Sequence, residues 1–248
     1  MKATEDQIAA ICCLTEDILR WPDHYEDPQC RMSDAEIVTT AVVAMMFFGG
    51  NFEKFRAMLR SSRHIPNMLN ASWFCRRPHR IRDLFFAISV FFSEVWKNLN
   101  TDSVYLIDSF PVAVCDNIRI PHSRIYKEEE CRGYNASERR YFYGLKVHMM
   151  CAGRGEPVEI FFTPGHVSDA EGLRLFAFNL PEKSIVYGDR SYNNYEIEDI
   201  LRETGNIRLM PIRKKNLRRQ YPPYVEYLRK KARKTVETAN SLITHKTC

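Results

Sequence analysis

The hydrophobic pattern of this chain changes near residue 100, and that change limits what its 248 residues can fold into. Before it, apolar residues recur every three or four positions. The run "SDAEIVTTAVVAMMFF", for example, begins with a capping box of Ser33 and Glu36 and ends at Gly49. After it, short apolar runs are separated by turns, as strands are. The pattern predicts an all-helical domain over residues 1–100 and an α/β domain over residues 101–248.

Two more helices are expected in the first hundred residues. Asn51 can cap the segment "FEKFRAML", and apolar residues from Pro78 to about Leu99 recur at helical spacing. We therefore expect a short helix after the glycine turn, and then one long helix that leads into the second domain.

Five strands and three helices are expected after residue 100. The strand candidates are "SVYLID", "YFYGLKVHMMC", "PVEIFFTP", "SIVYGD" and "IRLMPI". Pro111 is expected to end regular pairing soon after the first of them, because proline has no amide hydrogen. A capping box of Ser168 and Glu171 opens the first helix, a C-cap glycine closes "NNYEIEDILRETG", and prolines open "PPYVEYLRKKARKTVETANSLI". This order predicts a mixed sheet flanked by helices.

Three acidic residues stand where a metal site is expected. Asp108 ends the first strand candidate, Asp189 directly follows "SIVYG", and Glu237 lies inside the last helix. If the first and fourth strands are neighbours, both aspartates reach the same edge of the sheet, and a helix crossing there supplies the glutamate. Oxygen ligands of this kind suit Mg²⁺ or Mn²⁺, and two such ions about 4 Å apart promote in-line phosphoryl transfer. Each acid also has an ordinary alternative: turn formation or helix capping for the aspartates, and a surface ion pair with Arg233 for the glutamate.

Basic residues are concentrated at the C-terminal end of the chain. Residues 201–248 hold 13 basic and 3 acidic side chains, whereas residues 101–200 hold 11 and 16. This balance favours a polyanion, and double-stranded DNA held at the acids is the expected partner. The candidate phosphate contacts are Arg213, Lys214, Lys215, Arg218, Arg219, Lys230, Arg233 and Lys234. A second cluster lies in the helical half, and for either cluster a plain solvated surface is the alternative; its members are Arg76, Arg77, Arg80 and Arg82.

The remaining candidate sites are weaker. His148 and His166 have no second histidine at metal-ligand spacing, so zinc is not favoured. Asp169 is interpreted as a helix cap, and a position beside the first metal is the alternative. The eight cysteines show no paired metal spacing and are expected to be reduced core thiols. The apolar stretches are too short to cross a membrane and no secretory signal is visible, so a cytoplasmic protein is expected.

Several long runs carry a resemblance to a known family. They are "LIDSFPV", "CDNIRIP", "RRYFYGLKVH", "PVEIFFTPG", "VYGDRSYNNYEIED", "LMPIRKKN" and "RKTVETANSLI". The chain resembles the DDE transposases of bacterial insertion sequences over nearly its whole length, and most of all the insertion-sequence family nine-eight-two. The resemblance implies an RNase H-like catalytic domain in which Asp108, Asp189 and Glu237 are the catalytic, metal-binding acids. It also matches Arg233 to the arginine of a Y-x-x-R-x-x-x-E signature, whose tyrosine is replaced here by Lys230.

The implied function is that of a DNA transposase in the bacterial cytoplasm, associated with the nucleoid. Water attacks a phosphodiester at the element's end, and the freed 3′-hydroxyl then attacks target DNA. The resemblance implies two Mg²⁺ or Mn²⁺ ions and a homo-oligomer on the terminal repeats. Only eleven residues follow Glu237, where relatives continue, so we expect a C-terminally truncated copy. Two alternatives stay open: a DNA-binding protein without chemistry, and a metal-dependent nuclease without strand transfer.

Overall fold

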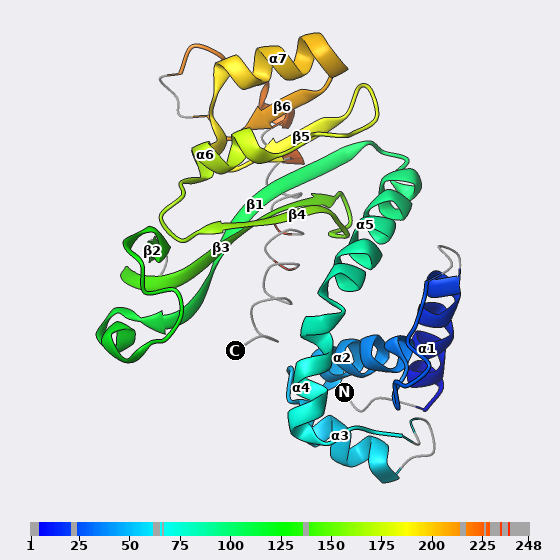
Figure 1. Ribbon diagram of the computed structural model, residues 1–248. Helices are drawn as coiled ribbons and strands as arrows, with labels where there is room; N and C mark the ends of the chain where they lie inside the picture. Colours follow the sequence, from blue (N-terminus) through cyan, green and yellow to red (C-terminus); the bar gives the residue numbers. More distant parts are fainter. Residues whose placement is uncertain are drawn as a thin grey trace. The chain divides into compact units, whose positions relative to one another are not determined.

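The computed structural model describes residues 5–20, 24–61, 65, 67–135, 139–213, 217–225, 227, 228, 234 and 238. These residues form two compact units, which divide between Phe91 and Phe92 inside one helix (Figure 1). The boundary that we predicted at residue 100 lies at the end of the same helix. Each unit is described by itself below.

The first unit is helical, as its hydrophobic pattern predicts. Its helices are α1 (Glu5–Arg20), α2 (Asp34–Phe48), α3 (Phe52–Ser61), α4 (Ala71–Arg80) and the first half of α5 (Arg82–Leu99). They surround a core that includes Met32, Ile37, Val43, Phe55 and Phe74.

The ends of α2 and the start of α3 follow the sequence signals closely. Ser33 Oγ accepts a hydrogen bond from the Glu36 amide at 3.1 Å, and the Glu36 carboxylate accepts one from the Ser33 amide at 2.7 Å. Gly49 closes the helix in the left-handed conformation, with φ 57°. Asn51 then accepts a hydrogen bond from the Lys54 amide at 3.0 Å. The predicted capping box, glycine turn and asparagine cap are thus confirmed.

The expected long helix up to Leu99 is confirmed as α5, but it begins at Arg82 rather than Pro78, because the chain breaks at Ile81. Pro78 lies inside α4, and Ile81 caps that helix with φ −104° and ψ 24° before α5 begins at Arg82. Ile81 is buried in the core, and Leu84, Phe85 and Ile88 pack against that core from the far side of the break. The apolar spacing therefore runs through the break without revealing it.

One member of the second basic cluster supports the fold of the first unit. Arg77 donates a hydrogen bond to the buried Asp34 carboxylate at 2.7 Å and another to the Met32 carbonyl at 3.2 Å, and its side chain is only 13% exposed. Arg76, Arg80 and Arg82 are exposed. The cluster therefore contains one structural arginine and three on the surface.

The second unit is built on a mixed six-stranded sheet. Its strands are β1 (Val104–Asp116), β2 (Arg132–Asn135), β3 (Arg140–Ala152), β4 (Pro157–Pro164), β5 (Ile185–Gly188) and β6 (Arg208–Pro211). Their order is β2-β3-β1-β5-β6, and β4 also pairs with β3. β1 runs antiparallel to β3 and parallel to β5, which confirms the predicted neighbours and is compatible with an RNase H-like sheet. β2 was not predicted.

β1 continues well beyond Pro111, which corrects the expected end of the first strand. Pro111 pairs with Lys146 of β3, and the pairing continues to Asp116. On its other side β1 pairs with β5 only from Val104 to Leu106. Pro111 therefore lies where this side of β1 has no ladder to β5, and the missing amide hydrogen costs no hydrogen bond there.

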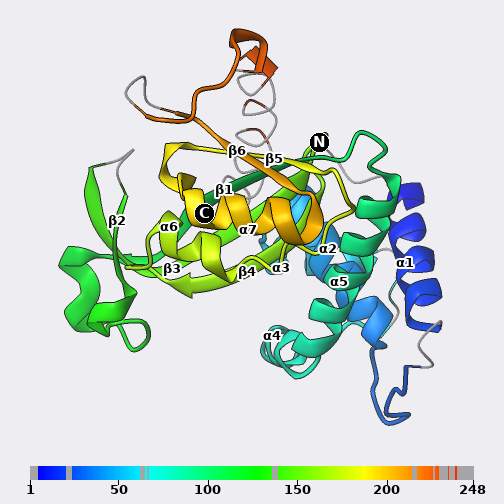
Figure 2. The same ribbon diagram turned by 90° about the horizontal axis from the view of Figure 1, so that it is seen from above.

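Two helices and a short 3₁₀ turn cover one face of the sheet. They are α6 (Asp169–Gly172), η4 (Arg190–Tyr192) and α7 (Tyr195–Gly205), and Figure 2 shows both helices on the same side of the strands. The core between them includes Tyr105, Ile107, Leu173, Tyr192 and Leu201. The predicted capping box of Ser168 and Glu171 is present. The predicted C-cap glycine is wrong: Gly205 is the last helical residue, and Asn206 takes the left-handed cap position with φ 53°.

Within the described ranges, no helix taken alone has the length and apolar composition to cross a membrane. α2 and the start of α3 have the required length and apolar composition only when they are taken together, and they are bent at the break between them. α2 is also largely buried in the core.

Candidate active site

The two predicted aspartates end up at matching positions on neighbouring strands. Leu106 of β1 pairs with Tyr187 of β5. Asp108 and Asp189 each follow two residues later, and the backbone of Asp189 is still extended, with φ −73° and ψ 178°. Because side chains two residues apart share a face of a sheet, both carboxylates lie on the same face as Leu106 and Tyr187.

The chain that leads towards Glu237 packs against this same face. Val225 is buried against Leu106 and Tyr187, and Tyr221 joins the same cluster. Residues 223–225 are helical, as the proline start of the last helix predicts. Glu237 itself lies outside the described residues, so its position beside the aspartates remains a prediction.

A backbone amide orients each aspartate. Asp108 Oδ1 accepts a hydrogen bond from the Ser109 amide at 2.9 Å, and Asp189 Oδ1 accepts one from the Arg190 amide at 2.6 Å. Asp189 is thereby the N-cap of η4, which is one of the ordinary roles that the sequence allowed. Both carboxylates are half-buried, so an approaching ligand can reach them.

Tyr192 is buried close to the segments that carry Asp108, Asp169 and Asp189. Its side chain is 1% exposed, and it lies beneath Gly188, where an added methyl group would contact the ring at 3.2 Å. Burial raises the pKa of Tyr192 well above its ordinary value, and the nearby charges of Asp169, Asp108 and Asp189 raise it further. The charges of three acids from three separate segments of the chain thus raise the pKa of one buried hydroxyl.

Asp169 is not a helix cap, contrary to its predicted role. Ser168 caps α6, and the Asp169 carboxylate instead points to the sheet. It accepts a hydrogen bond from Ser109 Oγ at 2.6 Å and forms an ion pair with Lys146 Nζ at 2.5 Å. These contacts could not be predicted, because β1, β3 and α6 supply them from positions up to 60 residues apart.

The histidines occupy structural positions. His148 is fully buried, stacks on Phe161 and hydrogen-bonds Thr163 Oγ1 at 3.0 Å through Nε2. Burial lowers the pKa of His148 to about 4, and the charge of Lys146 lowers it further. His166 Nδ1 contacts the Glu130 carbonyl at 2.5 Å.

Two arginines in the described part of the basic segment are paired with acidic residues of the protein itself. The Arg213 side chain is 1% exposed and donates to Glu198 at 2.5 Å, to Asn193 at 2.6 Å and to Tyr221 at 2.9 Å. Arg219 forms a bidentate pair with Asp199 at 2.8 and 2.7 Å. Arg218 and Lys234 are exposed. The other predicted phosphate contacts, Lys214, Lys215, Lys230 and Arg233, lie outside the described residues.

The carboxylates of Asp108 and Asp189 are suitable ligands for a hard divalent cation. Among the described residues, no three His, Cys, Asp or Glu side chains form a metal cluster. Asp108 and Asp189 offer two carboxylates on one face, and a hard cation prefers oxygen ligands with water completing its shell. Burial raises the pKa of the nearby Cys151 to about 12, and the charge of Asp108 adds to this effect, so this thiol stays protonated. The two aspartates therefore fit as part of an oxygen-ligand site.

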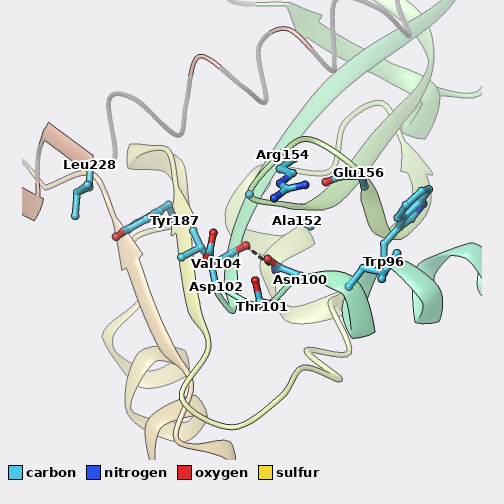
Figure 3. A pocket seen from close by; sticks show the side chains of 12 residues that line it. Trp96, Asn100, Thr101, Asp102, Val104, Ala152, Arg154, Glu156, Tyr187 and Leu228 are labelled. Atoms are coloured by element: carbon cyan, nitrogen blue, oxygen red, sulfur yellow. Dashed lines mark hydrogen bonds between the residues drawn. The ribbon is translucent and has the colours of Figure 1, made fainter.

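A separate cavity of about 480 Å³ opens at the other end of β1 (Figure 3). Its wall includes Trp96, Val104, Arg154, Glu156 and Tyr187. Asn100 Nδ2 donates to the Val104 carbonyl at 3.0 Å across its floor. Asp108 is four residues further along the strand, about 13 Å away at the usual rise, so the acids do not line this cavity.

A mixed sheet that presents carboxylates on two neighbouring strands is typical of enzymes that act on phosphodiesters with divalent metals. The family model described as Transposase DDE domain matches residues 98–247, which is more than half of the chain. The chain therefore belongs to the transposase DDE domain family and is a nucleic-acid-processing protein. Searches among curated proteins and among solved structures find no match.

Proposed function

We propose that this chain is the DNA transposase of an insertion sequence, most similar to the insertion-sequence family nine-eight-two. It hydrolyses phosphodiester bonds at the element's ends and transfers the freed strand into target DNA. The observation that carries the proposal is the matched position of Asp108 and Asp189 on neighbouring strands. Their side chains lie on the face of the sheet against which Val225 packs.

In this proposal Asp108, Asp189 and Glu237 hold Mg²⁺ or Mn²⁺. Bound there, one or two such ions would activate the attacking oxygen and stabilise the leaving oxygen. The amides of Ser109 and Arg190 keep the two aspartates oriented before substrate arrives. The attacking group is water in the first step and the 3′-hydroxyl of the element in the second, and no covalent enzyme intermediate is needed.

We further propose that DNA contacts come from exposed cations. Arg218 and Lys234 are exposed in the second unit, and Lys214, Lys215, Lys230 and Arg233 share the same basic segment. Arg76 and Arg80 are exposed on α4 of the helical unit, near Trp73, over whose ring Arg76 lies at 5.9 Å. Arg213 is left out of this set because its guanidinium is buried among protein partners. Binding as a homo-oligomer on the terminal repeats completes the proposal.

Removal of one aspartate charge tests the assignment. We expect Asp108→Asn and Asp189→Asn each to keep DNA binding but to lower single-turnover nicking by more than about a hundredfold, because a direct ligand should matter more than an outer-shell partner. The measurement uses a duplex that spans the genomic boundary of the element, with Mg²⁺ or Mn²⁺ and with EDTA. Asp102→Asn is the matched control, since Asp102 is exposed six residues before Asp108.

Normal nicking by either variant would remove that aspartate from the active site. Binding without nicking by the unaltered chain would favour the DNA-binding protein without chemistry. Nicking that never joins the element end to a second duplex would favour the nuclease without strand transfer.

A further inference from the structure

Asp169 connects three separate segments behind the candidate active site. Its Oδ1 accepts from Ser109 Oγ of β1 at 2.6 Å and pairs with Lys146 Nζ of β3 at 2.5 Å. Ser191, in η4, lies close enough to help lower the pKa of this carboxylate, and α6 contacts η4. One side chain thus joins two strands of the sheet to the turn that follows β5.

The partners of Asp169 adjoin the two aspartates. Ser109 directly follows Asp108, and its side chain lies on the opposite face of the strand because successive side chains alternate. Ser191 follows Asp189 by two residues, in the turn that Asp189 caps. Any shift of β1 against this turn would therefore have to disturb these contacts of Asp169.

α6 is itself fixed, so Asp169 has a rigid base. The capping box of Ser168 and Glu171 closes the first turn. Gly172 packs so closely on the buried His148 that an added methyl group would lie 2.2 Å from the ring. Asp169 is therefore held against the sheet from both ends of its short helix.

Lys146 neutralises the charge of the half-buried Asp169 carboxylate through an ion pair. Burial tends to raise the pKa of Asp169, but hydrogen bonds from Lys146 and Ser109 and the charge of Lys146 outweigh it, so the pKa lies below its usual range. Lys146 also donates to the Val167 carbonyl at 3.3 Å, one residue before the N-cap of α6. Asp169, which accepts from Ser109 and pairs with Lys146, can therefore hold the strand segments that carry these two residues in place.

We propose that Asp169 is a positioning residue that fixes the spacing between Asp108 and Asp189, and that Lys146 holds it in place through their ion pair. This inference rests on the proposed function, because the spacing matters only if the two aspartates share a cation. Metal sites depend on such outer-shell contacts, whose loss typically costs 10–100-fold in metal affinity.

The test is a Mn²⁺ titration of the full chain, followed by electron paramagnetic resonance of the free ion, with thermal unfolding measured in parallel. We expect Asp169→Asn to weaken Mn²⁺ binding ten- to a hundredfold, because the amide keeps the shape but loses the ion pair. The double variant Ser109→Ala/Ser191→Ala cuts the bridge while the ion pair remains, and it should also weaken binding. It serves as the second variant if Asp169→Asn fails to fold.

Two controls separate positioning from general stability and from the proposed function. Ser33→Ala removes the capping box of α2 in the first unit and should lower the melting temperature without changing Mn²⁺ affinity. Asp108→Asn should abolish the binding. Unchanged affinity in Asp169→Asn or in the double serine variant, when Asp108→Asn binds no Mn²⁺, would overturn the positioning role alone. Unchanged affinity in Asp108→Asn would overturn the proposed function and this inference together.

Discussion

At the scale of single residues, the second unit hides a histidine that cannot take up a proton without cost. His148 is fully buried between Phe161 and the backbone of Gly172, and its pKa in the folded protein is about 4 against 6.5 for a free side chain. The unfolded chain therefore binds a proton more readily than the folded one between these two values. Stability from this residue is complete above pH 6.5 and is lost as the pH falls towards 4.

We expect this titration to remove about 3 kcal/mol of unfolding free energy between pH 7 and pH 4, from a pKa difference of roughly 2.5. Urea unfolding at several pH values measures it. In His148→Phe, which keeps a ring against Phe161 but cannot titrate, the pH dependence should be shallower by that amount. Parallel curves for both proteins would show that His148 is not protonated on unfolding in this range.

At the residue scale, the sequence predicted the neighbouring positions of Asp108 and Asp189, whose metal-binding role stays a prediction, but it did not predict the burial of Arg213. Asp108 was noticed because an acid at a strand end, followed by apolar residues, has few ordinary uses. Arg213 was grouped with its basic neighbours, whereas the fold buries it against Glu198 and Tyr221. Its partners lie 8 and 15 residues away, and charge density along the chain carries no information about such pairings.

At the scale of elements, α6 packs closely against the sheet at Gly172. Gly172 has ordinary helical backbone angles, so helix propensity alone would make alanine the better residue there by about 1 kcal/mol. The added methyl group would instead lie 2.2 Å from His148 Cε1. A buried ring held by stacking and a hydrogen bond has little room to move.

We therefore expect Gly172→Ala to destabilise the protein by roughly 1–3 kcal/mol, as overpacking does. Gly153→Ala is the matched control, because its methyl group would meet Val104 at an ordinary 3.5 Å. Chemical denaturation of both variants gives the comparison. Equal stability of the two would mean that α6 can shift away from the sheet.

Most features with local signals were predicted correctly, with the C-cap at Gly205 as an exception, whereas features that depend on distant partners were not. The capping boxes at Ser33 and Ser168 rest on contacts three residues apart, which a sequence displays directly. The break at Ile81 and the continuation of β1 through Pro111 depend instead on which core or neighbouring strand is present. The spacing of apolar residues along the sequence indicates neither the helix break nor the continued strand.

At the scale of the whole molecule, the uneven charge predicts a salt-sensitive interaction with DNA. The last 48 residues carry 13 basic and 3 acidic side chains. Part of this charge is neutralised inside the protein by the pairs of Arg213 with Glu198 and of Arg219 with Asp199. The charge available to phosphates is therefore smaller than the composition indicates.

We expect the triple variant Lys214→Ala/Lys215→Ala/Arg218→Ala to reduce the slope of log affinity against log salt by up to about three, near one per lost phosphate contact. Fluorescence anisotropy with a labelled duplex over a salt series measures the slope. The control triple variant Arg174→Ala/Lys183→Ala/Arg202→Ala removes the same charge from exposed positions elsewhere. If both triple variants lower the slope equally, net charge rather than the basic segment attracts DNA.

The proline in β1 has a further consequence for how the protein behaves in a crowded cell. Because β5 pairs with β1 only at Val104–Leu106, the later part of β1 has no ladder to β5 on that side. Exposed strand edges of this kind recruit strands from other copies and start aggregates. Pro111 withholds one donor from such a partner, and the charge of Asp108 repels an apolar one. The same stretch of strand can thus stay open to a large substrate while it resists polymerisation.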